Sequence, residues 1–198
     1  MRFRWATATD RHELARVWQR AWHKAHAAIV DCPRALAQCN VESFDRRLVL
    51  FERNHERYEE LHIRPTALVV EERSSRILGF AIIRHGNALE QFYIDNDVQG
   101  TGVGTKLLAA TEATMLKQGC EVAHLIVAMR NARANRFYER RGWLVTGSQP
   151  WMHEETPWYP YHEPSVDGRR AEEMATDRLA TDAPSMRCTR YKKFLGYD

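Results

Sequence analysis

A glycine-rich segment between a β-rich run and a helical pattern constrains this chain more than any other feature. Gly100, Gly102 and Gly104 fall within five residues, where a helix is expected to begin at about Gly102. Glycines leave main-chain N–H groups uncovered, and a helix start adds unpaired N–H groups and the positive end of the helix dipole. Three glycines are more than a tight turn requires, so we predict a site for a phosphate or diphosphate between Gln99 and Thr105.

Two nucleotide-binding motifs fit this segment poorly. A P-loop places Gly-Lys-Ser/Thr at the helix entrance, whereas Lys106 here follows Thr105. Gly100 and Gly102 satisfy the dinucleotide fingerprint Gly-x-Gly-x-x-Gly, but its third position is Thr105. That fingerprint also follows the first strand of a parallel sheet, whereas we expect this turn to follow an antiparallel meander. A nucleotide-binding protein is therefore a competing hypothesis, and it predicts tight binding of ATP or NAD.

Hydrophobic periodicity predicts helices and strands in a mixed order. Asp10 with Glu13 marks the start of an amphipathic helix that carries apolar residues as far as Ile29 and that Pro33 ends. Further helices are expected at Ser43–Leu61, Gly102–Gln118 and Ala132–Arg141. Strands are expected at residues 3–8, Thr66–Glu71, Ile77–Arg84, Ala88–Ile94, Val122–Ala128, Trp143–Gly147 and Met186–Leu195. The second, third and fourth of these strands are expected to form the antiparallel meander.

Length and charge narrow the class of protein. The 198 residues suit a single domain, with a long insertion at 149–184 that is rich in proline, aromatic and acidic residues. That segment contains eight acids against three arginines, although the whole chain carries +3. A protein with a basic surface for nucleic acid is not expected to carry such an acidic segment, so no nucleic-acid partner is expected. The excess positive charge elsewhere suits a small ligand that bears phosphate.

Membrane and metal sites are not expected either. No apolar run approaches the roughly 18 residues of a membrane span, and no apolar stretch near the N-terminus is typical of a secretory signal. We therefore expect a cytoplasmic protein. The four cysteines lack the spacing of a zinc or redox site and are expected to be free thiols. His23 and His26 lie three residues apart without supporting carboxylates or cysteines, so no metal is expected.

Two segments of the chain are typical of one enzyme family when they occur in this order. The first is Gln99-x-x-Gly102-x-Gly104, preceded by Phe92-Tyr93-Ile94, and the second runs from Asn131 through Phe137-Tyr138 to Gly142-Trp143. Together they resemble the acetyl-CoA motifs of the GNAT superfamily of N-acetyltransferases, and the resemblance covers residues 3–147 and the final strand. It implies an α+β (mixed α/β) fold, with a central, mostly antiparallel sheet of about six or seven strands flanked by about four helices.

The resemblance also implies where acetyl-CoA binds. Its diphosphate would sit on the main-chain N–H groups of the turn, which consists of Gln99, Gly100, Thr101, Gly102, Val103, Gly104 and Thr105. The backbone of Phe92, Tyr93 and Ile94 would pair with the pantetheine arm and polarise the acetyl carbonyl. Asn131 would bind the pantetheine arm beside the small Ala134. Arg136 would meet the 3′-phosphate of CoA, the alternative being a solvated basic face.

Tyr138 is implied to be the general acid, which gives a proton to the departing CoA thiolate. The alternative is an aromatic residue packed beside Phe137. Asn131 and Tyr138 are about two helical turns apart, so both are expected to point to one side of the helix.

The general base is less well defined. The two positions at which family members carry a glutamate hold Ala88 and Ile126 here. Glu90 lies two residues after Ala88 and is expected on the same side of the strand, so we name it as the candidate base, acting directly or through a water molecule. His153 or Glu154 of the insertion could serve instead, or the enzyme could bind the neutral amine without a dedicated base.

The acceptor site is expected to involve the insertion at 149–184. Its acids would attract an ammonium group, and its Trp and Tyr faces would bind a cation. We therefore expect direct acetyl transfer in a ternary complex to a cationic primary amine: a polyamine, an aminoglycoside-like compound, an amino acid derivative or a peptide N-terminus. Many members of the family are dimers, so a homodimer is an expectation from the resemblance alone. The alternative function is a non-catalytic acyl-CoA sensor or partner-binding module on the same fold.

Overall fold

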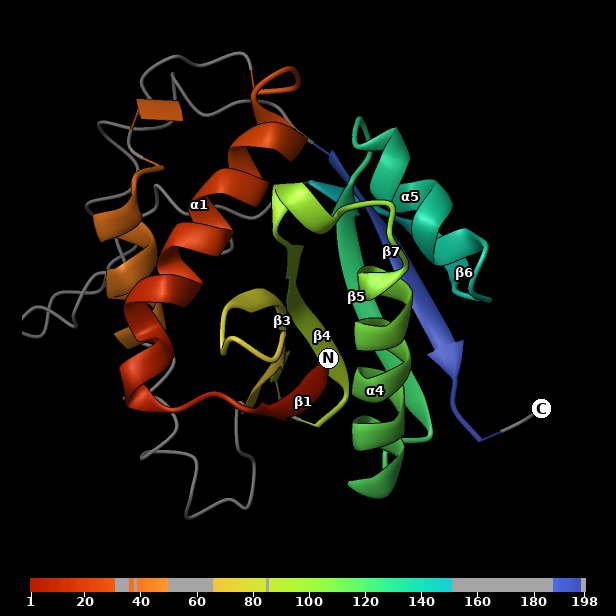
Figure 1. Ribbon diagram of the computed structural model, residues 1–198. Helices are drawn as coiled ribbons and strands as arrows, with labels where there is room; N and C mark the ends of the chain where they lie inside the picture. Colours follow the sequence, from red (N-terminus) through yellow and green to blue (C-terminus); the bar gives the residue numbers. More distant parts are fainter. Residues whose placement is uncertain (31–35, 38, 50–65, 85, 151–186, 197–198) are drawn as a thin grey trace, which may run out of the picture.

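Seven strands form one sheet in the computed structural model, which describes residues 1–30, 36–37, 39–49, 66–84, 86–150 and 187–196 (Figure 1). The strands are β1 (Arg2–Trp5), β2 (Thr66–Glu71), β3 (Ile77–Arg84), β4 (Ala88–Ile94), β5 (Val122–Ala128), β6 (Leu144–Pro150) and β7 (Arg187–Phe194). Their order across the sheet is β1-β2-β3-β4-β5-β7-β6. Every neighbouring pair is antiparallel except β4 and β5, which are parallel. The predicted mostly antiparallel sheet and its β2–β4 meander are confirmed.

Helices cover both faces of the sheet. The labelled helices are α1 (Arg11–His26), α4 (Val103–Lys117) and α5 (Ala132–Glu139), with 3₁₀ helices η1 (Ala8–Asp10) and η2 (Asn96–Val98), and residues 41–49 are also helical. In Figure 1, α1 and α4 lie on opposite sides of β3 and β4. The expected α+β architecture with helices on both faces is therefore confirmed. No helix within the described ranges combines the length and the apolar character that crossing a membrane requires.

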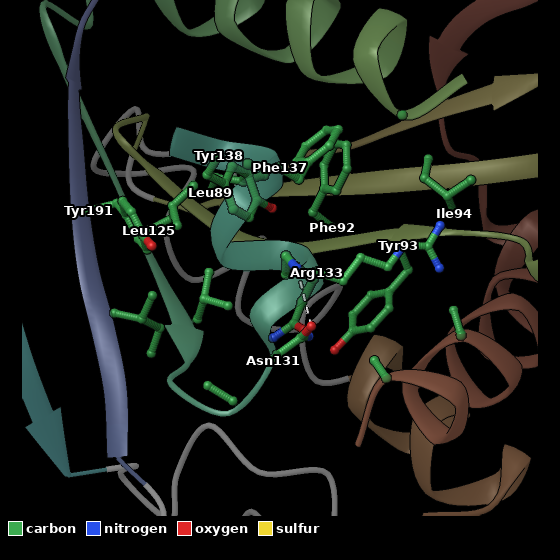
Figure 2. Close-up of a pocket in the computed structure, with 18 of the residues that line it drawn as sticks. Leu89, Phe92, Tyr93, Ile94, Leu125, Asn131, Arg133, Phe137, Tyr138 and Tyr191 are labelled. Atoms are coloured by element: carbon green, nitrogen blue, oxygen red, sulfur yellow. Dashed lines mark hydrogen bonds between the residues drawn. The ribbon is translucent and has the colours of Figure 1, made fainter. Parts of the chain in front are cut away.

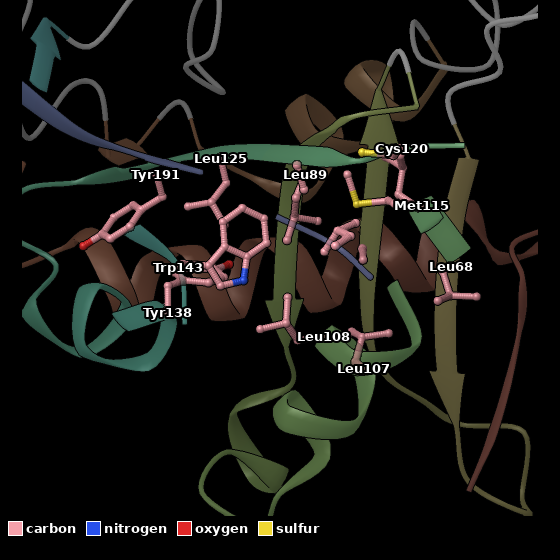
Figure 3. Packing of buried hydrophobic residues seen from close by; sticks show 14 of the residues in the cluster. Leu68, Leu89, Leu107, Leu108, Met115, Cys120, Leu125, Tyr138, Trp143 and Tyr191 are labelled. Carbon is pink, nitrogen blue, oxygen red and sulfur yellow. The ribbon is translucent and has the colours of Figure 1, made fainter. Parts of the chain in front are cut away.

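Two clusters of buried side chains hold these layers together. On the α4 face, Leu107, Leu108 and Met115 pack against the sheet, and Trp143 extends the cluster toward α5 (Figure 3). On the α1 face, Trp18 packs against Phe44 with ring centroids 4.8 Å apart. Each such side chain contributes about 1.5–3 kcal/mol by leaving water. The helical spacing of these residues in the sequence predicted which face of each helix would be buried.

Helix α1 ends earlier than predicted. Its last residue is His26, and the main-chain N–H groups of Ile29 and Val30 both donate to the His26 carbonyl, at 2.9 Å each. Ile29 is buried as expected, but it lies in the turn after the helix rather than on its face. The prediction that Pro33 ends the helix is therefore wrong. The chain turns within an Ala-Ala-Ile-Val run, where no glycine or proline marks the end.

The start of α1 also differs from the predicted capping box. The Asp10 carboxylate accepts from the Thr7 main-chain N–H at 2.7 Å and from Arg4 Nη1 at 2.6 Å. Glu13 does not reach back to the helix start, because its Oε1 accepts from the main-chain N–H of Ile77 at 2.9 Å. Asp10 is nevertheless the N-cap residue of α1, as predicted, and its pairing with Arg4 joins the helix to β1. Glu13 joins α1 to β3.

The remaining predicted elements agree closely within the described residues. The ranges expected for β2, β3, β4 and β5 are those observed, and α4, α5, β6 and β7 differ from the prediction by a few residues at their ends. The second predicted helix is present over 41–49, and the rest of it lies outside the described residues. Most of the predicted insertion, including its acids and aromatic residues from Trp151 on, also lies outside the described residues.

Candidate active site

A cavity opens where the parallel strands β4 and β5 separate. Strands β4 and β5 pair at Ala88 and His124, beside a 2.8 Å hydrogen bond from the His124 N–H to the Asn87 carbonyl, and no further register partners join them along the described chain. The cavity has a volume of about 1390 Å³ and is lined by both strands, the glycine turn, α5 and the C-terminal half of α1. Diverging strands leave main-chain groups without a neighbouring strand, so a ligand can pair with them.

The main chain of β4 shows which residues face this gap. The Asp95 N–H donates to the Leu78 carbonyl of β3 at 2.8 Å. Because successive residues of a strand direct their N–H and C=O groups to opposite sides, the main chain of Tyr93 also faces β3, whereas that of Phe92 and Ile94 faces β5. Figure 2 shows the side chains of Phe92 and Tyr93 on opposite sides of β4. The predicted main-chain contact with a ligand is thus open to Phe92 and to the N–H of Ile94, whose carbonyl already accepts from Gln99, while Tyr93 lines the cavity.

The three glycines of the turn serve two different purposes. Gly100 and Gly102 have φ values of +86° and +89°, a region that residues with a Cβ rarely adopt. Gly104 instead permits close packing, because a Cβ there would lie 3.4 Å from Ile94 and 3.6 Å from Phe137. No acceptor is recorded within the described chain for the N–H groups of Gly102, Val103, Gly104 and Thr105 at the start of α4. These groups form the donor set that a diphosphate would require.

Gln99 fixes the turn through its side chain, a role that the motif alone did not predict. Its Nε2 donates to the Ile94 carbonyl at 2.9 Å and to Asn96 Oδ1 at 3.1 Å. Its Oε1 accepts from Arg133 Nη1 of α5 at 2.6 Å. Gln99 therefore connects the end of β4, the glycine turn and α5, which together border the cavity.

Asn131 lies at the start of α5 rather than within it. Its Oδ1 caps the helix by accepting from the Ala134 N–H at 3.1 Å. Asn131, Ala134 and Tyr138 all line the cavity, and Figure 2 shows Asn131 and Tyr138 there. The prediction assumed that Asn131 and Tyr138 lie two turns apart in one helix. Asn131 precedes the helix as its N-cap residue, so its cap position and the helical position of Tyr138 together bring the two residues to the same cavity. Its side-chain Nδ2 points to no acceptor recorded in the described chain, so this group can donate to a ligand.

Tyr138 combines burial with a place on the cavity wall. The residue is 7% exposed, and its ring lies 5.2 Å from Phe137 and 5.9 Å from Trp143, measured between centroids. Burial raises the pKa of the Tyr138 hydroxyl well above its ordinary value, and the nearby Tyr93 and Glu112 add to the shift. The hydroxyl therefore keeps its proton at neutral pH. The ring is thus packed as the alternative interpretation expected, and the role of Tyr138 as a proton donor stays a prediction.

Glu90 occupies a β-bulge. Ile83 pairs with Leu89 and Ile82 with Gln91, so Glu90 is an additional residue on β4. The bulge breaks the strict alternation that the sequence-based placement of Glu90 assumed, and the residue nevertheless lines the cavity. Its Oε1 accepts from Arg84 Nη1 at 3.3 Å, and its buried Oε2 has no hydrogen-bond partner in the described structure. Burial raises the pKa of Glu90, while Arg84 and Arg47 oppose the rise.

Arginines surround the cavity near α5. The predicted Arg136 lines the cavity and is exposed. Arg141, which sequence reasoning missed, donates to Thr105 Oγ1 in the glycine turn and to the Phe137 carbonyl at 2.9 Å, with its guanidinium 3.8 Å from the Phe137 ring centroid. Its position four residues after Phe137 was the available signal, because residues at that spacing lie on one side of a helix. Arg141 therefore adds positive charge next to the turn.

Metal ligands are not gathered in the described chain. It contains no group of three or more histidine, cysteine or acidic side chains suited to a metal ion. Cys39, Cys120 and Cys188 are buried free thiols, as predicted for these three.

Comparisons with known proteins agree on one family. A family model described as an acetyltransferase (GNAT) domain matches residues 36–162. Uncharacterized N-acetyltransferases of Mycobacterium tuberculosis and Mycobacterium bovis are 30% identical over 147 residues, which cover 71% of this chain and 87% of theirs.

Solved structures show the same fold at lower sequence identity. The PaiA N-acetyltransferase of Thermoplasma acidophilum, solved with coenzyme A, has a TM-score of 0.61 at 20% identity and covers 73% of this chain and 89% of its own. YncA of Salmonella typhimurium, solved with acetyl-CoA, has a TM-score of 0.62 at 20% identity and covers 100% of this chain and 95% of its own.

Proposed function

Since this chain belongs to the GNAT family of N-acetyltransferases, we propose that it transfers an acetyl group from acetyl-CoA to the primary amine of a small molecule or peptide. The transfer would take place by direct attack, with both substrates in the cavity between β4 and β5. The observation that carries this proposal is that the free main-chain N–H groups of the turn, the gap-facing edge of β4 and Tyr138 all border one cavity.

The diphosphate of acetyl-CoA would bind at the start of α4. The N–H groups of Gly102, Val103, Gly104 and Thr105 are without acceptors in the described chain, and the helix dipole adds positive potential there. Arg136 or Arg141 would meet the remaining phosphate charge. Arg141 is already held next to the turn through Thr105.

The pantetheine arm would lie along the open edge of β4. The main chain of Phe92 and Ile94 faces the gap, so the arm would extend the sheet as an additional strand does. Asn131 would donate from Nδ2, because its Oδ1 already caps α5. This arrangement directs the thioester toward the point where β4 and β5 begin to separate.

The chemistry then needs one base, one oxyanion donor and one acid. Glu90 would take a proton from the ammonium group, and the amine nitrogen would attack the thioester carbon. A main-chain N–H of β4 would stabilise the oxyanion of the tetrahedral intermediate. As the carbon–sulfur bond breaks, the Tyr138 hydroxyl would give its proton to the CoA thiolate. The second proton lost by the attacking nitrogen would then return to the Tyr138 oxygen, so the products are the N-acetylated amine and CoA.

Release of CoA thiol from acetyl-CoA in the presence of an amine panel tests the proposal. Amine-dependent release that saturates with acetyl-CoA supports it. Binding of acetyl-CoA without release by any amine would favour the non-catalytic alternative. The presence of Ile126 at a position where some family members carry a glutamate base also favours it. Tight binding of ATP or NAD with no affinity for CoA would contradict both.

A further inference from the structure

The segment that leads from β4 into the glycine turn is organised by two amide side chains. Its short helix η2 begins with Asn96, and Gln99 follows η2 directly. A 3₁₀ helix has three residues per turn, so side chains three positions apart lie over one another. Gln99 Nε2 accordingly donates to Asn96 Oδ1 at 3.1 Å. Gln99 lines the cavity, whereas Asn96 is outside the set of described residues that line it.

Helix α1 holds η2 at two points, both through Arg20. The main-chain carbonyl of Arg20 accepts from Asn96 Nδ2 at 3.1 Å. The guanidinium of Arg20 donates to Asp95 Oδ2 at 2.8 Å, and Arg76 donates to the same oxygen at 3.0 Å. The Asp95 side chain is 2% exposed, so these charged hydrogen bonds are shielded from water at the carboxylate. The position of η2 is therefore set by α1 as well as by its own chain.

The partners determine how both amide groups are oriented. An arginine only donates, so the oxygen of Gln99 must face Arg133 of α5, whose Nη1 lies 2.6 Å from it. A main-chain carbonyl only accepts, so Gln99 Nε2 must face the Ile94 carbonyl, at 2.9 Å. The same rule turns Asn96 Nδ2 toward the Arg20 carbonyl and leaves its oxygen for Gln99. Turning either amide over would set donor against donor and acceptor against acceptor.

The side chain of Gln99 is consequently occupied. Its two Nε2 hydrogens are used by Ile94 and Asn96, and its oxygen accepts from Arg133. A phosphate oxygen accepts hydrogen bonds, so a ligand phosphate would have to take its donors from the main chain of the turn. The Gln99 side chain instead holds that main chain between α1 and α5. In Figure 2 the Arg133 side chain extends from α5 toward β4.

We propose that Asn96 is a positioning residue for CoA: through Gln99, it keeps the glycine turn where its main-chain N–H groups meet the diphosphate. The inference rests on the proposed function and deepens it, because it assigns a role to a residue that does not line the cavity. Hydrogen bonds weaken steeply as their angle departs from linear, so a displaced turn would bind the phosphates less well. The thioester, which would lie farther along β4, would be affected much less.

Two acetyl donors test the assignment. Acetyl-CoA uses the turn, whereas S-acetylpantetheine carries the same thioester without the diphosphate and nucleotide. In Asn96→Ala, we expect kcat/KM with acetyl-CoA to fall by about 5–50-fold, the effect of one or two hydrogen bonds. The fall should arise mainly in KM, with kcat, and kcat/KM for S-acetylpantetheine, within about twofold of the native values. An equal fall with both donors would overturn the proposal, because lost folding or a distorted reaction centre affects both.

Gln118→Ala is the matched control. It also removes an amide, from an exposed residue at the other end of α4, where no hydrogen bond of this side chain is recorded in the described chain. The ratio of kcat/KM between the two donors should equal the native ratio. A ratio as strongly reduced as in Asn96→Ala would contradict a specific role for Asn96.

A double-mutant cycle tests whether Asn96 acts through Gln99. Gln99→Leu removes the partner that links Asn96 to the turn. The double variant should therefore bind CoA no more weakly than Gln99→Leu alone in calorimetric titration, because the second substitution has nothing left to disconnect. Losses of affinity that add up across the two substitutions would refute the path through Gln99.

Failure of this inference can be distinguished from failure of the proposed function. If the native protein prefers acetyl-CoA to S-acetylpantetheine and Asn96→Ala keeps the native preference, only the positioning role is refuted. If no amine supports thiol release, CoA affinity decides: binding about 5–50-fold weaker in Asn96→Ala but not in Gln118→Ala supports the inference, and unchanged affinity refutes it. A native protein that does not bind CoA would refute the proposed function and this inference with it.

Discussion

At the scale of single residues, the proposed chemistry depends most on Tyr138 and Glu90. Both are largely buried, both line the same cavity, and burial raises the pKa of both. For Tyr138 the shift keeps the hydroxyl protonated, so a proton is available on the cavity wall. For Glu90 it makes the carboxylate a stronger base, which suits removal of a proton from an ammonium group.

Replacing Tyr138 with phenylalanine removes the proposed acid while the aromatic packing is kept. We expect kcat for thiol release to fall by about 10²–10⁴-fold, with the affinity for acetyl-CoA changed little. Tyr191→Phe is the control, since that hydroxyl donates to Asn135 Oδ1 at 2.8 Å and has no assigned part in the reaction. An unchanged kcat in a folded Tyr138→Phe protein would remove the acid role.

The pH dependence of kcat/KM tests Glu90. Its pKa is raised, so the carboxylate gains a proton as the pH falls through a value above the 4.5 of an ordinary glutamate. The base is then lost, and kcat/KM should decline on this acid limb. Glu90→Gln should lower kcat/KM by about 10²–10⁴-fold and abolish this limb, leaving only the pH dependence of the amine itself. A limb that persists in the variant would assign the proton transfer to another group.

At the scale of elements, the sequence predicted positions well where spacing and turn chemistry agree. The observed ranges of β2, β3, β4 and β5 match the prediction, because apolar runs there are bounded by glycine, serine or asparagine turns. The end of α1 was missed because no glycine or proline marks it. The bulge at Glu90 was missed because an extra residue in a strand depends on its pairing with β3, which the sequence of β4 alone does not record.

The junction of β1 and α1 makes an element-level prediction for stability. The Arg4 guanidinium lowers the pKa of Asp10 to about 2, from an ordinary 3.8. Because the folded-state pKa is depressed, this stabilisation is complete above pH 3.8 and is lost as the pH falls toward 2. Urea unfolding between pH 5 and 2 should show a decline of about 1 kcal/mol that Asp10→Asn lacks, after allowance for partial solvent exposure. Identical slopes in both proteins would contradict the assignment.

At the scale of the whole molecule, the motifs identified the turn and Tyr138, and the fold adds the distribution of charge. The cavity-lining side chains of Lys24, Arg47, Arg84 and Arg130 come from α1, the helix at 41–49, β3 and the segment after β5. Sequence spacing cannot show that such distant residues share one cavity. The acidic insertion, by contrast, could be recognised from the sequence because its acidic residues lie in one continuous segment.

Removal of the insertion tests its expected role in the acceptor site. Pro150 and Arg187 are register partners on neighbouring antiparallel strands, so a short hairpin loop can join them. Replacement of 151–186 by Asn-Gly should preserve folding and acetyl-CoA affinity and should change KM for the acceptor. Loss of the folded state would show that the segment belongs to the core of the domain. An unchanged acceptor KM would show that the insertion is not part of the acceptor site.

The central claim is that main-chain N–H groups between Gln99 and Thr105 bind the diphosphate of CoA, and calorimetric titration with CoA tests it most directly. Gly102→Glu places a negative side chain at this site, whereas Gly119→Glu makes the same change at the other end of α4, where φ is +86° and the space is equally open. We predict that the native protein and Gly119→Glu bind CoA with similar affinity and that Gly102→Glu binds at least about tenfold more weakly. Equal affinity in all three proteins, or no heat from the native protein at millimolar CoA, would contradict the claim.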